Sequence, residues 1–365
     1  MSVAMVLAGC LPAPPTQTTT VASGLTIPWD LGFTPNGTIL FTQRGSGLFA
    51  HAAGTTRLVY TPPDLLSANE AGMMGLALDP AFADNRRVYV CLASTLGAGG
   101  ADVRVARLRL NTGLTAVTAR ADILTGIPVN DNPGLRGRHA GCRLRFGPDG
   151  ALWIGTGDAL IGPAPQSPTS LAGKVLRITT NGDPAPGNPG GRFDPRIYSY
   201  GHRNIQGLAF RPSDGAPFAV EHGPACDDEV NRLVPGGNYG WDPTAFPGDT
   251  GYDENRPMTD LTRYPDARRA VWSSGCPTIA TSGATFLTGS AWGSWDGGLA
   301  IACLKGSRIH LIRIDAAGNG IVGVSSGLTE FGRLRTPVQG PDGALYLATS
   351  NGGGNDRILR VTPTT

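Results

Sequence analysis

The sequence lacks features that mark several common classes of protein. It has no long run of Lys or Arg, and a formal net charge of +2 over 365 residues gives no basic surface of the kind that binds nucleic acid. It has no Cys-x-x-Cys pair, which argues against a zinc site. No stretch beyond the N-terminus is apolar over the length that crosses a bilayer. We therefore expect a globular protein that does not bind nucleic acid.

Long amphipathic segments with a helical period are also missing, and strands do not alternate with helices, which argues against a doubly wound fold. Gly (53) and Pro (30) are instead abundant, and they stand between short apolar runs. This pattern is typical of many short strands joined by turns.

One phrase, a turn followed by a short apolar strand, recurs six times. Pro presets φ and Gly accepts a positive φ, so these turns reverse the chain tightly. The copies are FTPNGTILFTQR (33–44), LDPAFADNRRVYVCLAS (78–94), FGPDGALWIGTGD (146–158), FRPSDGAPFAVEHG (210–223), GSWDGGLAIACLKG (293–306) and QGPDGALYLATSNG (339–352). With the β-like runs beside them, they predict an all-β fold: a six-bladed β-propeller with four-stranded antiparallel blades. A pair of β-sandwiches is the alternative.

The N-terminal segment MSVAMVLAGC ends in Leu7-Ala8-Gly9-Cys10, which resembles the lipobox of bacterial lipoprotein signals. It predicts cleavage before Cys10 and a lipid anchor on its thiol, followed by a flexible Pro/Thr-rich tether. We expect residues 1–21 to be signal remnant and tether and 22–365 to be a single propeller. The protein would be exported, to the periplasm or cell surface; an arbitrary apolar N-terminus is the alternative.

Five further cysteines would form disulfides in an exported protein, and an odd number leaves one unpaired. Cys303 lies in the apolar run GLAIACL, where a buried thiol packs as a small hydrophobe. We prefer the pairs Cys91–Cys142 and Cys226–Cys276, although the sequence does not fix the connectivity.

Two motifs, one with a histidine and one with an arginine, contain candidate catalytic residues. His139 precedes one predicted strand and Asp158, 19 residues later, follows the next, so a hairpin would bring both to one face. A carboxylate beside an imidazole fixes its tautomer and raises its basicity. Arg203 and Asn204, in SYGHRNIQGLAF, offer a planar fork and an amide to a polar ligand. The alternative for His139 and Asp158 is that they are unrelated loop residues. The alternative for Arg203 and Asn204 is that they only stabilise a loop.

Two further motifs suggest binding. Lys305, Arg333 and Arg335 could form a ring of cations for a polyanionic ligand, since the alternation Arg-x-Arg points both guanidinium groups to one face. The acidic, Gly-dense stretch 221–242 offers oxygen ligands for calcium, although its spacing is not that of an EF-hand. The residues from 224 to 292 read as a long functional loop. Scattered surface charge and a solvated acidic loop are the alternatives.

From about residue 22 to the C-terminus, the chain resembles the soluble quinoprotein glucose dehydrogenases and aldose sugar dehydrogenases, the glucose/sorbosone dehydrogenase family. The matching segments include NEAGMMGLALDPAFADNRRVYV, RHAGCRLRFGPDGALWIGTGD, YSYGHRNIQGLAF and EHGPACDDEVNRLVPGGNYGW, in family order. The resemblance implies a six-bladed propeller that uses pyrroloquinoline quinone (PQQ) and calcium to oxidise aldoses at C1 to lactones.

The resemblance also implies roles for single residues. His139 matches the base that takes the C1 hydroxyl proton as hydride passes to the quinone, and Asp158 its orienting partner. The other matches are Arg203 and Asn204 (quinone contacts), Lys305, Arg333 and Arg335 (cofactor carboxylates and quinone oxygens), Gly223 and Pro224 (calcium, through their carbonyls), and Glu229 and Tyr239 (a second calcium).

Three residues depart from the family pattern: Glu70 stands where some members carry Gln near the sugar and cofactor, Cys142 replaces a small residue, and Arg138 replaces an acidic one. The predicted function is thus a PQQ- and calcium-dependent aldose dehydrogenase that passes electrons to an unidentified acceptor. A non-catalytic cell-surface binding module is the runner-up, and a lactonase-type hydrolase is a third hypothesis that leaves the basic ring unexplained.

Overall fold

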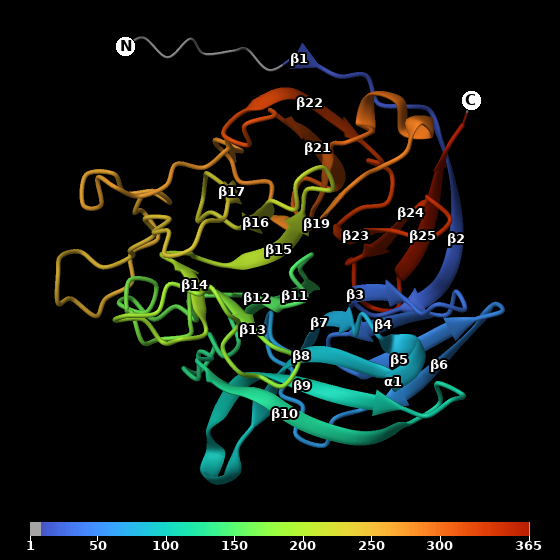
Figure 1. Cartoon of the computed structure of the whole chain (residues 1–365), viewed down its shortest axis with the longest axis horizontal. Helices are drawn as coiled ribbons and strands as arrows, with labels where there is room; N and C mark the ends of the chain where they lie inside the picture. Colours follow the sequence, from blue (N-terminus) through green and yellow to red (C-terminus); the bar gives the residue numbers. More distant parts are fainter. Residues whose placement is uncertain (1–8, 365) are drawn as a thin grey trace.

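The computed structural model describes residues 9–364, which form a ring of six β-sheets around a central axis (Figure 1). The predicted six-bladed propeller is confirmed, and the pair of β-sandwiches is wrong. Residues 1–8 of the predicted signal remnant lie outside the described residues. The described helices are short: α1 (Phe82–Asn85) and the 3-10 segments η1 (Gly97–Gly99) and η2 (Ser290–Trp295), which is kinked at Gly293.

The first three blades follow one another in the chain. Blade 1 consists of β3 (Pro28–Phe33), β4 (Ile39–Gln43), β5 (Gly47–Ala52) and β6 (Thr55–Tyr60). Blade 2 consists of β7 (Met73–Leu78), β8 (Arg87–Thr95), β9 (Ala101–Leu110) and β10 (Val117–Ile127). Blade 3 consists of β11 (Gly141–Phe146), β12 (Leu152–Thr156), β13 (Lys174–Ile178) and β14 (Ile197–Tyr200).

The remaining blades complete the ring. Blade 4 consists of β15 (Ile205–Phe210), β16 (Pro217–Glu221), β17 (Glu229–Arg232) and β18 (Trp272–Ser273). Blade 5 consists of β19 (Thr281–Phe286), β20 (Leu299–Cys303), β21 (Arg308–Ile314) and β22 (Ile321–Gly327), with β1 (Gly9–Cys10) as a fifth strand. Blade 6 consists of β23 (Leu334–Gln339), β24 (Leu345–Thr349), β25 (Asp356–Pro363) and β2 (Thr16–Leu25).

Each of the six turn phrases joins the first and second strands of one blade. In blade 3 the Gly147 N–H donates to the Ala151 carbonyl and Gly150 has φ 75°, a conformation that glycine adopts without strain. Their matching places confirm that the repeat marks one hairpin per blade.

The N-terminal strand β2 closes the ring, because it pairs antiparallel with β25, from Thr16 opposite Pro363 to Leu25 opposite Asp356. The propeller therefore starts at residue 16, inside the segment expected to be tether. Thr-rich alternation suits an outer strand, and pairing satisfies its backbone groups. The four-stranded antiparallel blades are as predicted, and the two-residue strand β1 additionally runs parallel to β22 at the edge of blade 5.

The first strands of neighbouring blades contact one another in a closed ring: β3, β7, β11, β15, β19 and β23. Since the second strand of each blade is antiparallel to the first, the start of a first strand and the end of a second strand lie at the same mouth of the ring. His139 and Arg203 precede first strands, whereas Asp158 and Gly223 follow second strands. The topology therefore gathers the predicted residues at one mouth.

A buried polar cluster fills the axis and ties four blades together. Arg143 of β11 pairs with Asp30 of β3 at 2.8 Å, with both side chains buried, and its guanidinium lies 4.1 Å from the ring centroid of Trp29. It also donates to the Gln206 carbonyl of β15 and to Thr336 of β23. Burial acts to raise the pKa of Asp30, yet Arg143 and Arg145 lower it overall. This cluster stabilises the ring beneath the site.

Disulfides join Cys91 to Cys142 and Cys226 to Cys276, which confirms both predicted pairs, and Cys303 is unpaired and buried as predicted. Within residues 9–364, no helix has the length and apolar character that crossing a membrane requires.

Candidate functional site

At the centre of the predicted site, Nδ1 of His139 lies 2.8 Å from Oδ1 of Asp158. His139 ends the turn before β11 and Asp158 follows β12, so the hairpin of blade 3 brings them together. Both side chains are buried. Burial acts to raise the pKa of Asp158, but His139 and Arg203 lower it overall, so the carboxylate is ionised at neutral pH. An ionised carboxylate only accepts, which places a proton on Nδ1 and, in the neutral imidazole, the lone pair on Nε2.

Two aromatic side chains from the long loop complete the bonding of Asp158. Its Oδ2 accepts from the Tyr252 hydroxyl at 2.6 Å and from the Trp241 indole at 2.7 Å. Burial and the charge of Asp158 raise the pKa of Tyr252, so the phenol stays protonated and donates. The Tyr252 oxygen also lies 3.2 Å from Nδ1 of His139. These contacts fix the orientation of the carboxylate, and with it that of the imidazole.

Arg203, two residues before β15, is held on several sides. Its Nη2 pairs with the Glu254 carboxylate at 2.6 Å, and its Nη1 lies 3.1 Å from the carbonyl oxygens of His222 and Gly223. The guanidinium lies 5.5 Å from the ring centroid of Trp241. Arg203 is therefore a rigid cation next to the His139–Asp158 pair.

Asn204 and Glu70 join blade 4 to blade 2. The Asn204 amide donates to Oε2 of Glu70 at 2.9 Å, and Gln206 donates to the same oxygen at 3.3 Å. Burial acts to raise the pKa of Glu70, but the imidazoles of His139 and His222 and the Asn204 bond lower it overall. Glu70 is thus an ionised carboxylate beside the predicted base.

A group of arginines lies on the other side of Glu70. Burial and the charges of Arg44 and Arg143 lower the pKa of Arg335 to about 9. Burial lowers the pKa of Arg44. The negative charge of Glu70 acts to raise it, and the positive charge of Arg333 lowers it further. Arg335 is buried and bonds to Ser350 and Gln206, whereas Arg333 is exposed. Mutual repulsion between close cations is relieved by an anion.

Lys305 follows β20 at the same mouth, but its side chain is exposed. Among the described residues, no hydrogen bond or ion pair joins Lys305 to the rest of the predicted site. The charges of Arg44, Arg333 and Arg335 act on one another, and of these three the sequence did not point to Arg44.

The site has buried polar atoms that lack partners. Across residues 9–364, these include Nε of Arg203, Oδ1 of Asn204 and Nε2 of His222. Buried polar groups in proteins are bonded as a rule, so such a cluster indicates a missing polar ligand. The donors and the arginines fit a planar, polyanionic carbonyl compound, which is the chemistry of PQQ.

The loop after β16 could contribute oxygen ligands. The Gly223 carbonyl faces Arg203, and the Gly223 N–H donates to Asp228, which also accepts from Thr278 and from the Ile279 and Ala280 N–H groups. Pro224 is half-buried beside it. Within the described chain, no group of three or more His, Cys, Asp or Glu could hold a metal. Calcium here would depend on carbonyls and on oxygens of the cofactor.

Glu229 begins β17 and is buried beside Glu221. Burial and the charge of Glu221 raise the pKa of Glu229 to about 8. Oxygens of Glu229 accept from Thr259 and Asn231. A buried acidic pair of this kind fits a cation. Tyr239 donates its hydroxyl to the Arg232 carbonyl, so only its main chain is left for a metal.

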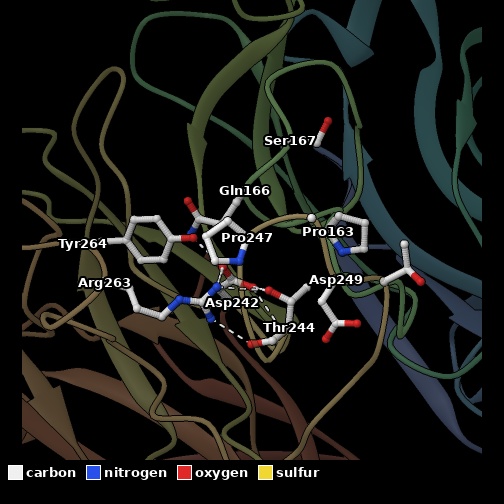
Figure 2. A pocket seen from close by; sticks show the side chains of 11 residues that line it. Pro163, Gln166, Ser167, Asp242, Thr244, Pro247, Asp249, Arg263 and Tyr264 are labelled. Atoms are coloured by element: carbon white, nitrogen blue, oxygen red, sulfur yellow. Dashed lines mark hydrogen bonds and ion pairs between the residues drawn. The ribbon is translucent and has the colours of Figure 1, made fainter.

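A cavity of about 540 Å³ lies between the long loop and the segment after Asp158 (Figure 2). Asp242 at its wall pairs with Arg263 at 3.0 Å and accepts from Thr244 and Tyr264. Its lining includes none of the predicted site residues. Because the polar groups of Asp242 are already paired, we assign no ligand to this cavity.

The sequence-based analysis missed Arg44, His222, Trp241 and Tyr252. Arg44 and His222 directly follow the second strands of their blades, the position that Asp158 nearly shares in blade 3. That shared position was a usable signal. Trp241 and Tyr252 lie in a loop without periodicity, and no pattern points them at Asp158.

Residues 25–360 match the model of the Glucose / Sorbosone dehydrogenase family. The chain therefore belongs to that family. It is 31% identical over 347 residues to the aldose sugar dehydrogenase YliI of Escherichia coli, covering 92% of this chain and 90% of that protein. It is 26% identical to quinoprotein glucose dehydrogenase B of Acinetobacter calcoaceticus, covering 91% and 85%.

Among solved structures, the PQQ-bound form of aldose sugar dehydrogenase from Streptomyces coelicolor superimposes with a TM-score of 0.76 at 32% identity. The similarity covers 96% of this chain and 99% of that chain.

Proposed function

We propose that this protein is a PQQ- and calcium-dependent aldose dehydrogenase that oxidises sugars at C1 to lactones. The observation that carries the proposal is the buried His139–Asp158 pair at 2.8 Å, which lies beside partnerless polar atoms of Arg203 and Asn204. Family membership and the relatives that are sugar dehydrogenases support it.

His139 acts as the general base. With its Nδ1 proton held by Asp158, Nε2 is free to take the proton of the C1 hydroxyl. Asp158 stabilises the imidazolium that forms, and the Tyr252 and Trp241 bonds keep that carboxylate in place. PQQ, when bound, supplies the two-electron acceptor for the hydride.

Arg203 and Asn204 would contact the quinone, and Arg335, Arg333 and Lys305 the carboxylates of the cofactor. Fixed cations stabilise negative charge that develops on an oxygen without having to reorganise. The carbonyls of Gly223 and Pro224 would hold the calcium that also binds the cofactor. Glu229 and the Tyr239 carbonyl would hold a second calcium. Glu70, which accepts from Asn204, would lie close to the same ligand, and its charge would affect the affinity.

Export and lipid anchoring through Cys10 also belong to this proposal. The two disulfides are typical of an oxidising compartment, and Cys10 is exposed and unpaired. A periplasmic or cell-surface enzyme of this kind would pass its electrons to a separate acceptor. Metabolic labelling with a fatty acid tests the anchor, with Cys10→Ala as the variant that should lose the label.

The activity is tested by dye-linked oxidation of a panel of aldoses by cofactor-free protein, with PQQ and calcium added separately and together. We expect turnover only with both additions. Tight PQQ binding without oxidation of any aldose would contradict the substrate class, and failure to bind PQQ would leave a non-catalytic binding module.

A further inference from the structure

We propose that the disulfide Cys91–Cys142 is a positioning element for His139: it ties the turn that carries the imidazole to the middle of the neighbouring blade. The inference rests on the proposed function in that His139 acts there as the base. Cys142 lies three residues after His139, where β11 begins.

The turn between the two residues has an unusual backbone. His139, Gly141 and Cys142 have φ values of 50°, 58° and 71°, all in the left-handed region that side chains with a Cβ disfavour. Such a conformation persists only where the surroundings impose it. Part of the constraint is steric, because a Cβ on Gly157 would collide with the His139 carbonyl.

Cys142 is also the irregular residue of its strand. Gly141 pairs with Thr156 and Arg143 with Gly155, so Cys142 is a bulge with no partner opposite it in the ladder. Bulges next to active sites redirect a side chain. Cys142 therefore has no pairing residue on β12 to fix its position, and the disulfide to Cys91 supplies that constraint instead.

The other end of the disulfide is rigid. Cys91 lies inside β8, which pairs with both β7 and β9, and the two cysteines are fully buried with Cα atoms 5.9 Å apart. The bond therefore fixes the turn of blade 3 relative to blade 2. Loss of the bond would leave the strained turn free to relax and would lengthen the contact between His139 and Asp158.

The second disulfide supplies a matched control. The residues that Cys226–Cys276 joins are 50 apart in the chain, against 51 for Cys91–Cys142, so both close loops of nearly equal entropy. Its loop is braced independently by the bonds of Asp228 to Gly223, Thr278 and Ile279. Removing either bond should lower the melting temperature, but only one removal should disturb His139.

The test compares Cys91→Ala/Cys142→Ala with Cys226→Ala/Cys276→Ala in the protein loaded with PQQ and calcium. We expect kcat for aldose oxidation to fall about tenfold or more in the first variant, because small displacements of a catalytic group are costly. PQQ affinity should stay within about twofold in this variant, and the control variant should lose similar thermal stability.

A second readout needs no activity. In cofactor-free protein, the Nδ1 proton of His139 should give a downfield NMR signal, which the first variant loses and the control keeps. A kcat that stays within about twofold of wild type in the first variant, or an unchanged His139 signal there, would overturn the proposal. If wild-type protein oxidises no aldose, the NMR result still decides it. Should the alanine pair not fold, Cys91→Ala/Cys142→Gly is the second variant. Glycine adopts φ 71° without strain, which favours folding, but it also opens more backbone conformations to the untethered turn, so the His139 signal should still be lost.

Discussion

The Asn204 amide nitrogen lies 2.9 Å from Oε2 of Glu70, so a residue that opens blade 4 bonds to one that opens blade 2. The carboxylate also acts on Arg44. Burial lowers the pKa of Arg44, and the negative charge of Glu70 acts to raise it. Glu70 is therefore an internal anion at the place where we expect an anionic cofactor, and the two negative charges compete.

Glu70→Gln should strengthen PQQ binding on the order of tenfold, because a close unit charge in a partly buried site contributes about 1 kcal/mol or more. The pKa of Glu70 is held below its ordinary value, so the group is ionised throughout the neutral range. A titration of PQQ into both proteins measures the change, and weaker binding in the variant would contradict the prediction.

Arg335→Met should separate stability from binding. Burial and neighbouring cations lower the pKa of Arg335 to about 9, so the buried charge destabilises the cofactor-free fold at neutral pH. We expect the variant to melt at a higher temperature without cofactor and to bind PQQ about tenfold to a hundredfold more weakly. Arg333→Met, at an exposed position, is the control and should leave the melting temperature unchanged.

Asp158→Asn should lower kcat by about a hundredfold or more, because an amide no longer stabilises the imidazolium or fixes its tautomer. Tyr252→Phe removes one of several bonds to the carboxylate, so a fall of less than about tenfold is expected. Single-turnover rates with saturating PQQ measure both. Equal losses in the two variants would show that Tyr252 has a role of its own.

The low pKa of Asp158 also predicts an effect on stability. A carboxylate whose folded pKa lies below its unfolded value stabilises the fold above the unfolded pKa, and this contribution is lost as the pH falls through the folded one. Acid unfolding of Asp158→Asn should therefore depend less steeply on pH below about 4 than that of the wild type. Equilibrium unfolding at several pH values measures the slopes.

The fold was predictable because the turn phrase repeats once per blade at one topological position. Phrases such as FGPDGALWIGTGD combine Pro and Gly turn chemistry with a buried strand, and both signals are local in sequence. The pairing of His139 with Asp158 followed from the same hairpin. The strand Thr16–Leu25 was missed because its pairing partner lies at the other end of the chain, at Asp356–Pro363.

The rest of the site depends on side chains that cross between blades. Glu70 reaches Asn204 from a position 134 residues away, and Tyr252 reaches Asp158 across 94. No periodicity encodes such contacts. Position in the fold alone is also not enough. Lys305 follows the second strand of its blade, β20, as other residues of the site follow theirs, yet its side chain is exposed.

The central claim is that His139 takes the proton from C1 of an aldose while PQQ is bound nearby. The direct measurement is the single-turnover reduction of bound PQQ by an aldose, followed by absorbance, in wild-type protein and in His139→Asn, each saturated with calcium. We predict a rate lower by about 10² to 10⁴ in the variant, with the PQQ affinity retained. An unchanged rate in the variant would contradict the assignment of His139 as the base.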